Sequence, residues 1–134
     1  PYNGKFYDIP HEIVNKLQID IANDIDLNKC KLANNNSVGG CVLIKREIFI
    51  EGGKFNPNFK NTGFDDNEIN MRFLKLGYKM GRTTSPLLHM SHHRGSTTYD
   101  HNIYNDHNLL ELQKIQNMSK NQLLDYIKNN YVAS

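Results

Sequence analysis

The sequence is poor in cysteine, in long apolar runs and in net charge, and each shortage excludes a class of protein. Its two cysteines, Cys30 and Cys41, are too few for a disulfide framework and lack the spacing of a metal-binding pair. Its apolar runs are far shorter than a membrane span, and we find no signal peptide. The formal net charge of the 134 residues is only +2, with basic residues scattered, so nucleic-acid binding is not expected.

The same features predict a cellular setting. Both cysteines are expected to be free, which fits a reducing compartment such as the cytoplasm. The chain opens at Pro1 without an initiator methionine, so we expect a fragment of a longer protein, with any membrane association made through the rest of that protein. At this length the chain forms one domain or part of one.

An acidic stretch, Asp65-Asp66-Asn67-Glu68, leads directly into a helical pattern. Ile69, Phe73 and Leu76 recur at i, i+4 and i+7, and Gly77 suits a helix end, so a helix is predicted from Asp65 to Leu76. Local pattern alone favours a structural interpretation of the acids. In that interpretation Asp65 is the N-cap of a capping box with Glu68, and Glu68 pairs with Arg72.

Glycines before this helix and histidines after it suggest chemistry instead. Residues 38–45 are predicted to form a buried strand containing Gly39 and Gly40, which indicate either a bulge or the close approach of a ligand. A predicted strand at residues 86–90 leads into His89, His92 and His93. Imidazole is the commonest metal ligand, although histidines that bind no metal fit this pattern equally well.

Weaker patterns predict the remaining elements. We expect a short helix at residues 11–17, a helical turn at 46–51 closed by Gly52-Gly53 with Phe55 in the core, and a short strand at 78–81. Amphipathic helices are expected from about Leu109 and from Ser119, where Ser119 and Gln122 match a capping box.

Taken together, these motifs resemble the second half of a GT-A glycosyltransferase. The resemblance covers residues 37 to 95 and is carried by SVGGCVLIKRE from Ser37, GGKFN from Gly52, GFDDNE from Gly63 with Arg72, and LHMSHHRG from Leu88. Inverting, family-2-like members show a Gly-Gly strand, a GGF turn, an acidic helix start and a late His-x-x-His in this order. The sequence departs from them where Asp65 replaces the usual Glu and where Lys54 splits the Gly-Phe pair.

The resemblance implies an α/β fold, the acceptor-side half of a GT-A fold with a mixed sheet and flanking helices. Residues 1–134 would be part of this domain, with the motif-bearing core at 37–95 and C-terminal helices at 105–131. It implies transfer of a sugar, with inversion, from a nucleotide-diphosphate donor to a glycan or other hydroxyl acceptor, as in polysaccharide biosynthesis.

The resemblance also implies that the donor side is incomplete. The family holds its cation and donor diphosphate with an Asp-x-Asp, which we expect before Pro1, because Asp24-Ile25-Asp26 lies too close to the glycine pair. We therefore expect residues 1–134 to be inactive alone. An exposed sheet edge and apolar face are expected to favour a homodimer.

Site residues follow from the same resemblance. Asp66 is implied as the general base. Substrate binding is implied for Gly39, Gly40, Phe64, Asp65, Glu68 and Arg94. A divalent cation, Mn²⁺ or Mg²⁺, is expected on His92 first and His89 second. Two other functions stay open: a metal-dependent hydrolase that uses the same acids and histidines, and a non-catalytic carbohydrate-binding module.

Overall fold

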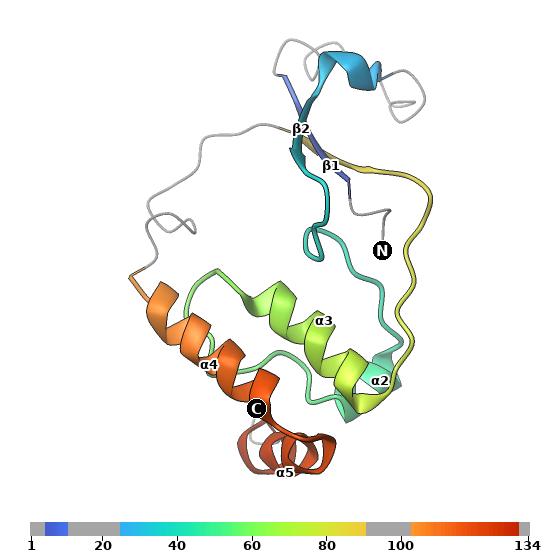
Figure 1. The fold of residues 1–134 in the computed structure, drawn as a ribbon. Helices are drawn as coiled ribbons and strands as arrows, with labels where there is room; N and C mark the ends of the chain where they lie inside the picture. The colour runs from blue at the N-terminus through green and yellow to red at the C-terminus, as the bar shows by residue number, and fades with distance from the viewer. Residues whose placement is uncertain (1–4, 11–24, 91–102, 132–134) are drawn as a thin grey trace. The chain divides into compact units, whose positions relative to one another are not determined.

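The acidic stretch and the glycine pair belong to different parts of the fold. The structure is a computed structural model and describes residues 5–10, 25–90 and 103–131 (Figure 1). The chain divides into a sheet unit, made of residues 1–42 and 81–93, and a helical unit, made of residues 43–80 and 94–134.

Within the described residues, the sheet unit contains three short strands: β1 (Phe6–Ile9), β2 (Lys31–Asn34) and β3 (Leu87–Met90). The central strand β1 runs antiparallel to β2 and parallel to β3. The sheet is therefore mixed, as predicted. A 3-10 turn, η1 (Leu27–Lys29), precedes β2, and the Asp26 carboxylate caps it by accepting a hydrogen bond from the Asn28 N–H at 3.0 Å.

The helical unit contains α2 (Arg46–Glu51), α3 (Asp65–Leu76), α4 (Asn105–Asn117) and α5 (Lys120–Asn130). Helix α3 packs against both α4 and α5. The core of this unit consists of Leu76, Ile115, Leu123, Ile127 and Tyr131. Full burial of such a side chain stabilises a fold by about 1.5–3 kcal/mol, so these contacts hold the three helices together. None of the described helices is long and apolar enough to cross a membrane.

Several predicted helix ends are confirmed. Helix α3 spans the predicted residues, and Gly77 follows it with a φ of 99°. The Tyr78 N–H then bonds the Phe73 carbonyl at 3.0 Å, and the two rings lie 5.7 Å apart. Helix α5 begins at the predicted capping box of Ser119 and Gln122. The predicted helical turn at 46–51 and the strand at 86–90 are also present, as α2 and β3.

The predicted strand at residues 38–45 is wrong. This segment has no regular secondary structure, and Val42 and Leu43, from its apolar centre, are 38% and 82% exposed. Gly40 has a φ of 88°, whereas residues in a regular strand have negative φ values. Among the described residues this apolar run has no strand partner, and β1 pairs with β2 instead.

Two smaller predictions are wrong as well, and a third concerns residues that the structure does not describe. Residues 78–81 contain no strand. Phe55 is 67% exposed rather than in the core, and it packs edge-on against Phe49 with ring centroids 5.2 Å apart. The predicted helix at residues 11–17 lies outside the described residues.

Gly53→Ala is expected to destabilise the helical unit strongly. Gly53 has a φ of 89°, and a Cβ there would lie 2.4 Å from Tyr131 Cδ2 and 2.7 Å from Ile127 Cγ2. Overpacking costs about 1–3 kcal/mol and a left-handed alanine about 1–2 kcal/mol more, so the loss should be about 2–5 kcal/mol in urea unfolding. The matched control is Gly81→Ala, because a Cβ at Gly81 meets nothing within 4 Å. Equal unfolding midpoints for the two variants would contradict this packing.

Candidate functional site

The acidic stretch forms the first turn of α3, which the chain enters through left-handed backbone. Gly63 has a φ of 115° and Phe64 a φ of 66°. Asp65 is the first helical residue, and its Oδ1 accepts a hydrogen bond from the Gly63 N–H at 3.0 Å. The predicted capping box is therefore wrong: Phe64 occupies the N-cap position, and the Asp65 carboxylate turns back to the loop.

Backbone strain is concentrated in the loop that leads to this turn. Lys54, Asn61 and Phe64 are non-glycine residues with φ values of 59°, 55° and 66°. A left-handed conformation costs an L-residue about 1–2 kcal/mol, and a bulky side chain such as Phe64 adopts it rarely. Strain of this kind persists only where surrounding contacts enforce it, and it is common at functional sites.

Asp66 is the exposed member of the acidic turn, whereas Asp65 is half-buried and Glu68 is buried. Although the residue as a whole is exposed, partial burial of its carboxyl group and the negative charge of Asp65 raise the pKa of Asp66 above the ordinary value. The dipole at the start of a helix acts in the opposite direction, because it favours an ionised carboxylate. Asp66 is thus accessible to a substrate and holds a proton more readily than an ordinary aspartate.

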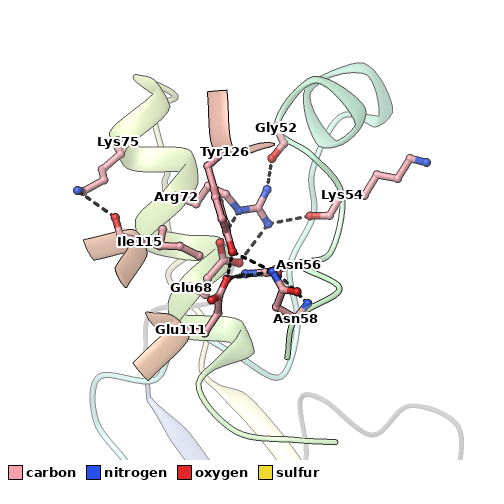
Figure 2. Close-up of polar contacts among 10 residues, drawn as sticks. All are labelled: Gly52, Lys54, Asn56, Asn58, Glu68, Arg72, Lys75, Glu111, Ile115 and Tyr126. Atoms are coloured by element: carbon pink, nitrogen blue, oxygen red, sulfur yellow. Dashed lines mark hydrogen bonds and ion pairs between the residues drawn. The ribbon is translucent and has the colours of Figure 1, made fainter. Parts of the chain in front are cut away.

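Glu68 is committed to a buried ion pair with Arg72 (Figure 2). The two side chains are 1% and 0% exposed, and Arg72 Nε lies 2.6 Å from Glu68 Oε1. The guanidinium also donates to the carbonyl oxygens of Gly52 and Lys54, the latter at 2.7 Å. Burial raises the pKa of Glu68, and the hydrogen bond and charge of Arg72 oppose that rise. Glu68 and Arg72 therefore tie α3 to the glycine turn at residues 52–54.

A cavity of about 190 Å³ lies beside the acidic turn. Its lining combines aromatic, amide and carboxylate side chains: Phe55, Asn56, Phe59, Asn61, Asp65, Glu68 and Ile69. An aromatic face with nearby polar groups suits a sugar ring, which presents apolar C–H groups and hydroxyls together. Sequence reasoning missed Phe55 and Phe59 as site residues, because a phenylalanine near a turn gives no signal that distinguishes a cavity from the core.

A polar network from α4 and α5 holds the same loop (Figure 2). Glu111 Oε1 accepts hydrogen bonds from Asn56 Nδ2 at 3.0 Å, from Asn58 Nδ2 at 3.3 Å and from the Tyr126 hydroxyl at 2.6 Å. Lys114 Nζ lies 3.8 Å from the other Glu111 oxygen. Partial burial alone would raise the pKa of Glu111, but these three hydrogen bonds and the charge of Lys114 lower it below the ordinary value.

Glu111→Gln is expected to lower stability in a pH-dependent way. Because the folded-state pKa of Glu111 is below its ordinary value of 4.5, the ionised group stabilises the fold above about pH 4.5. That contribution is lost as the pH falls through the folded-state pKa. The free energy of unfolding should drop by about 1–3 kcal/mol at pH 7, and the difference from wild type should shrink in acid. Exposed Glu47 provides the control, because Glu47→Gln should change stability by under about 0.5 kcal/mol. A difference for Glu111→Gln that does not vary with pH would contradict this role.

The predicted glycine pair lies in the sheet unit. Gly39 is buried and Gly40 is exposed, in the irregular segment that follows β2. Beside them, the Ser37 carbonyl accepts a hydrogen bond from Arg82 Nη1 at 2.8 Å. The structure therefore replaces the strand expected at these glycines with a loop in which Gly40 supplies a left-handed turn.

Of the predicted metal ligands, His89 is described and His92 is not. His89 lies on β3 opposite Asp8 on β1, and its Nδ1 is 2.9 Å from Asp8 Oδ1. A carboxylate on one imidazole nitrogen is the usual arrangement for a histidine that binds metal through the other. His92, His93 and Arg94 lie outside the described residues, within which no three His, Cys, Asp or Glu side chains gather as a metal site.

The helical unit thus brings together Phe64, Asp65, Asp66 and Glu68, whereas Gly39, Gly40 and His89 belong to the sheet unit. Residues 20–95, more than half of the chain, match the model of a protein family described as the N-terminal domain of galactosyltransferase. No curated protein and no solved structure matches the chain.

Proposed function

Since the chain belongs to the family of the N-terminal domain of galactosyltransferase, we propose that it moves a hexose from a nucleotide-diphosphate donor to a hydroxyl acceptor with inversion. The general base in this proposal is Asp66. The family supports the predicted glycosyltransferase activity, and the hydrolase and carbohydrate-binding alternatives are not favoured. That the chain is the acceptor-side half of a GT-A fold, and that it is family-2-like, remain predictions.

Asp66 supports the proposal through its place in the acidic turn. Glu68 is paired with Arg72 and Asp65 accepts the Gly63 N–H, whereas Asp66 is exposed and its pKa is raised. In the proposed reaction the acceptor oxygen attacks the anomeric carbon on the face opposite the diphosphate. The bond from that carbon to the diphosphate oxygen breaks, and the hydroxyl proton passes to the Asp66 carboxylate. This exposed carboxylate is the single observation that carries the proposed mechanism.

The cavity beside the turn is the proposed acceptor site. Asp65 lines it and would accept a hydrogen bond from an acceptor hydroxyl, while Phe59 offers an aromatic surface to the sugar ring. Phe64 is proposed to stack on a face of the sugar. Glu68 is assigned to binding only indirectly, because its carboxylate is buried against Arg72.

The donor is proposed to interact with residues outside the acidic turn. Gly39 and Gly40 would allow the donor sugar to approach the backbone closely, and Arg94 would contact the diphosphate. A divalent cation, Mn²⁺ or Mg²⁺, is proposed on His89, oriented by Asp8, together with His92. Such a cation would neutralise charge on the departing diphosphate. We propose galactose as the first donor sugar to test, because the family is described by that activity.

A transfer assay on the full-length protein tests the proposed function. The protein is incubated with Mn²⁺, with each of several nucleoside-diphosphate hexoses and with a panel of mono- and disaccharide acceptors. We expect release of nucleoside diphosphate that requires the acceptor, with a galactose donor among those used. Release that is equal with and without acceptor would indicate hydrolysis, and no release with any donor would overturn the proposal.

A further inference from the structure

Asn108 is a buried side chain of α4 that holds the loop leading into the acidic turn. It is 0% exposed. Its Oδ1 accepts a hydrogen bond from the Lys60 N–H at 3.0 Å, and its Nδ2 donates to the carbonyls of Lys60 at 2.9 Å and Gly63 at 3.2 Å. One side-chain amide thus bonds both the N–H and the carbonyl of Lys60, as a neighbouring strand would. It also bonds the carbonyl of Gly63, two residues before Asp65.

Gly63 links Asn108 to the Asp65 carboxylate through two hydrogen bonds. The Gly63 carbonyl accepts from Asn108, and the Gly63 N–H donates to Asp65 Oδ1 at 3.0 Å. Phe64, in its left-handed conformation, is the single residue between Gly63 and the start of α3. Because this backbone is strained, the direction in which Asp65 and Asp66 leave the loop depends on contacts that enforce it.

From this geometry we propose that Asn108 is a positioning residue for sugar transfer: through Lys60 and Gly63 it fixes the loop that aims Asp65 and Asp66. The inference rests on the proposed function, because the group being positioned is the proposed base. Asn108 lies beyond residues 20–95, so α4 would contribute to the site from outside the segment that matches the family.

The bonding of Asn108 supports positioning over simple packing. A buried amide destabilises a fold if its groups are left unpaired, so an apolar side chain is the simpler way to fill space between helices. The acceptor and both donors of Asn108 point at the same four-residue loop segment, 60–63. The neighbouring His107 bonds the Asn58 carbonyl through Nε2 at 2.8 Å, so the start of α4 holds this loop at two places.

Lys75 provides a matched control at the other end of the same pair of helices. Its Nζ donates to the carbonyls of Ile115 at 3.3 Å, Gln116 at 2.6 Å and Met118 at 2.6 Å, and so joins α3 to the end of α4. Like Asn108, it makes three hydrogen bonds to backbone groups. Lys75→Met should therefore loosen the helical unit without touching the acidic turn.

Amide hydrogen exchange in the full-length protein tests the proposal without relying on activity. In Asn108→Ala, the Lys60 amide loses its acceptor, and the Gly63 amide, which donates to Asp65, loses the contact that holds its loop. Exchange at both amides should become about three- to tenfold faster relative to the amides in the middle of α3. Asn108→Asp keeps the acceptor for Lys60 and loses both donors. Exchange should become faster at the Gly63 amide, while the Lys60 amide should exchange as slowly as in wild type. This variant serves as the test if Asn108→Ala does not fold.

Steady-state kinetics add a second measurement. Asn108→Ala should lower kcat by about tenfold or more with little change in the donor KM, and Lys75→Met should keep the wild-type kcat. Uniform faster exchange over loop and helices, equal in Asn108→Ala and Lys75→Met, would show that Asn108 only stabilises the unit and would overturn the proposal. If no sugar transfer is detected for wild type, the proposed function fails, and the exchange pattern still decides whether Asn108 fixes the acidic turn.

Discussion

Asp66→Asn should lower the rate of sugar transfer by about 10²–10⁴-fold, because it removes the group that accepts the hydroxyl proton. The fold should be nearly unaffected: Asp66 is exposed, and its loss also relieves repulsion with Asp65. We expect a change in the free energy of unfolding of about 0.5 kcal/mol or less, as for most surface substitutions. Initial rates at saturating donor and acceptor, measured beside urea unfolding, give both quantities.

Asp65→Asn is the matched control, since it removes a neighbouring carboxylate that faces the cavity. It should act mainly on the acceptor KM. A near wild-type rate for Asp66→Asn with an inactive Asp65→Asn would move the base by one residue. If both variants are active, the acidic turn has only a structural role.

Because the pKa of Asp66 is raised, the wild-type rate should fall on acidification at a pH above the ordinary aspartate value of 3.8, and this fall should be absent in Asp66→Asn.

Arg72→Leu should be the most destabilising single substitution in the helical unit. It leaves the Glu68 carboxylate, which is 1% exposed, without its partner, and it removes the donor from the Gly52 and Lys54 carbonyls. Loss of one partner from a buried ion pair costs about 3–5 kcal/mol. The guanidinium also lies over the rings of Phe73 and Tyr131, at 5.1 and 5.2 Å from their centroids, so its packing is lost as well.

A double-mutant cycle separates the ion pair from this packing. Glu68→Gln should be destabilising alone, but in the Arg72→Leu background it should restore stability, because it removes the unpaired charge. We expect a coupling of about 1–3 kcal/mol from the four unfolding curves. Additive effects of the two substitutions, or a loss below about 1 kcal/mol for Arg72→Leu, would contradict a buried, mutually dependent pair.

The elements that could be predicted carry local signals. Helix α3 shows its apolar period and its terminal Gly77, and α5 shows the Ser119 and Gln122 capping box, so both follow from residues close in the chain. The sheet does not follow from such signals. β2 is four residues long and exposed throughout, so it lacks the alternation of a half-buried strand. β1 pairs with β3, about eighty residues away, and no local pattern indicates that pairing.

The residues of the candidate site also divide into those with a local sequence signal and those without one. The acids of the α3 turn could be found from sequence, because three of them stand together before a helical pattern. Their environment could not be found, since Asn108 meets Lys60 across 48 residues and Glu111 meets Asn56 across 55. An Asn or Glu in an amphipathic helix is ordinarily a solvated residue, and only the folded chain shows that these two are buried and bonded to the loop.

The anomeric configuration of the first transfer product tests most directly whether Asp66 serves an inverting reaction. A galactose donor of known configuration is converted by the full-length protein, and the coupling constant of the anomeric proton in the new glycosidic bond is read by NMR before any equilibration. We expect the configuration opposite to that of the donor, because a base that deprotonates the acceptor permits a single displacement. A product that keeps the donor configuration would contradict both inversion and the role assigned to Asp66.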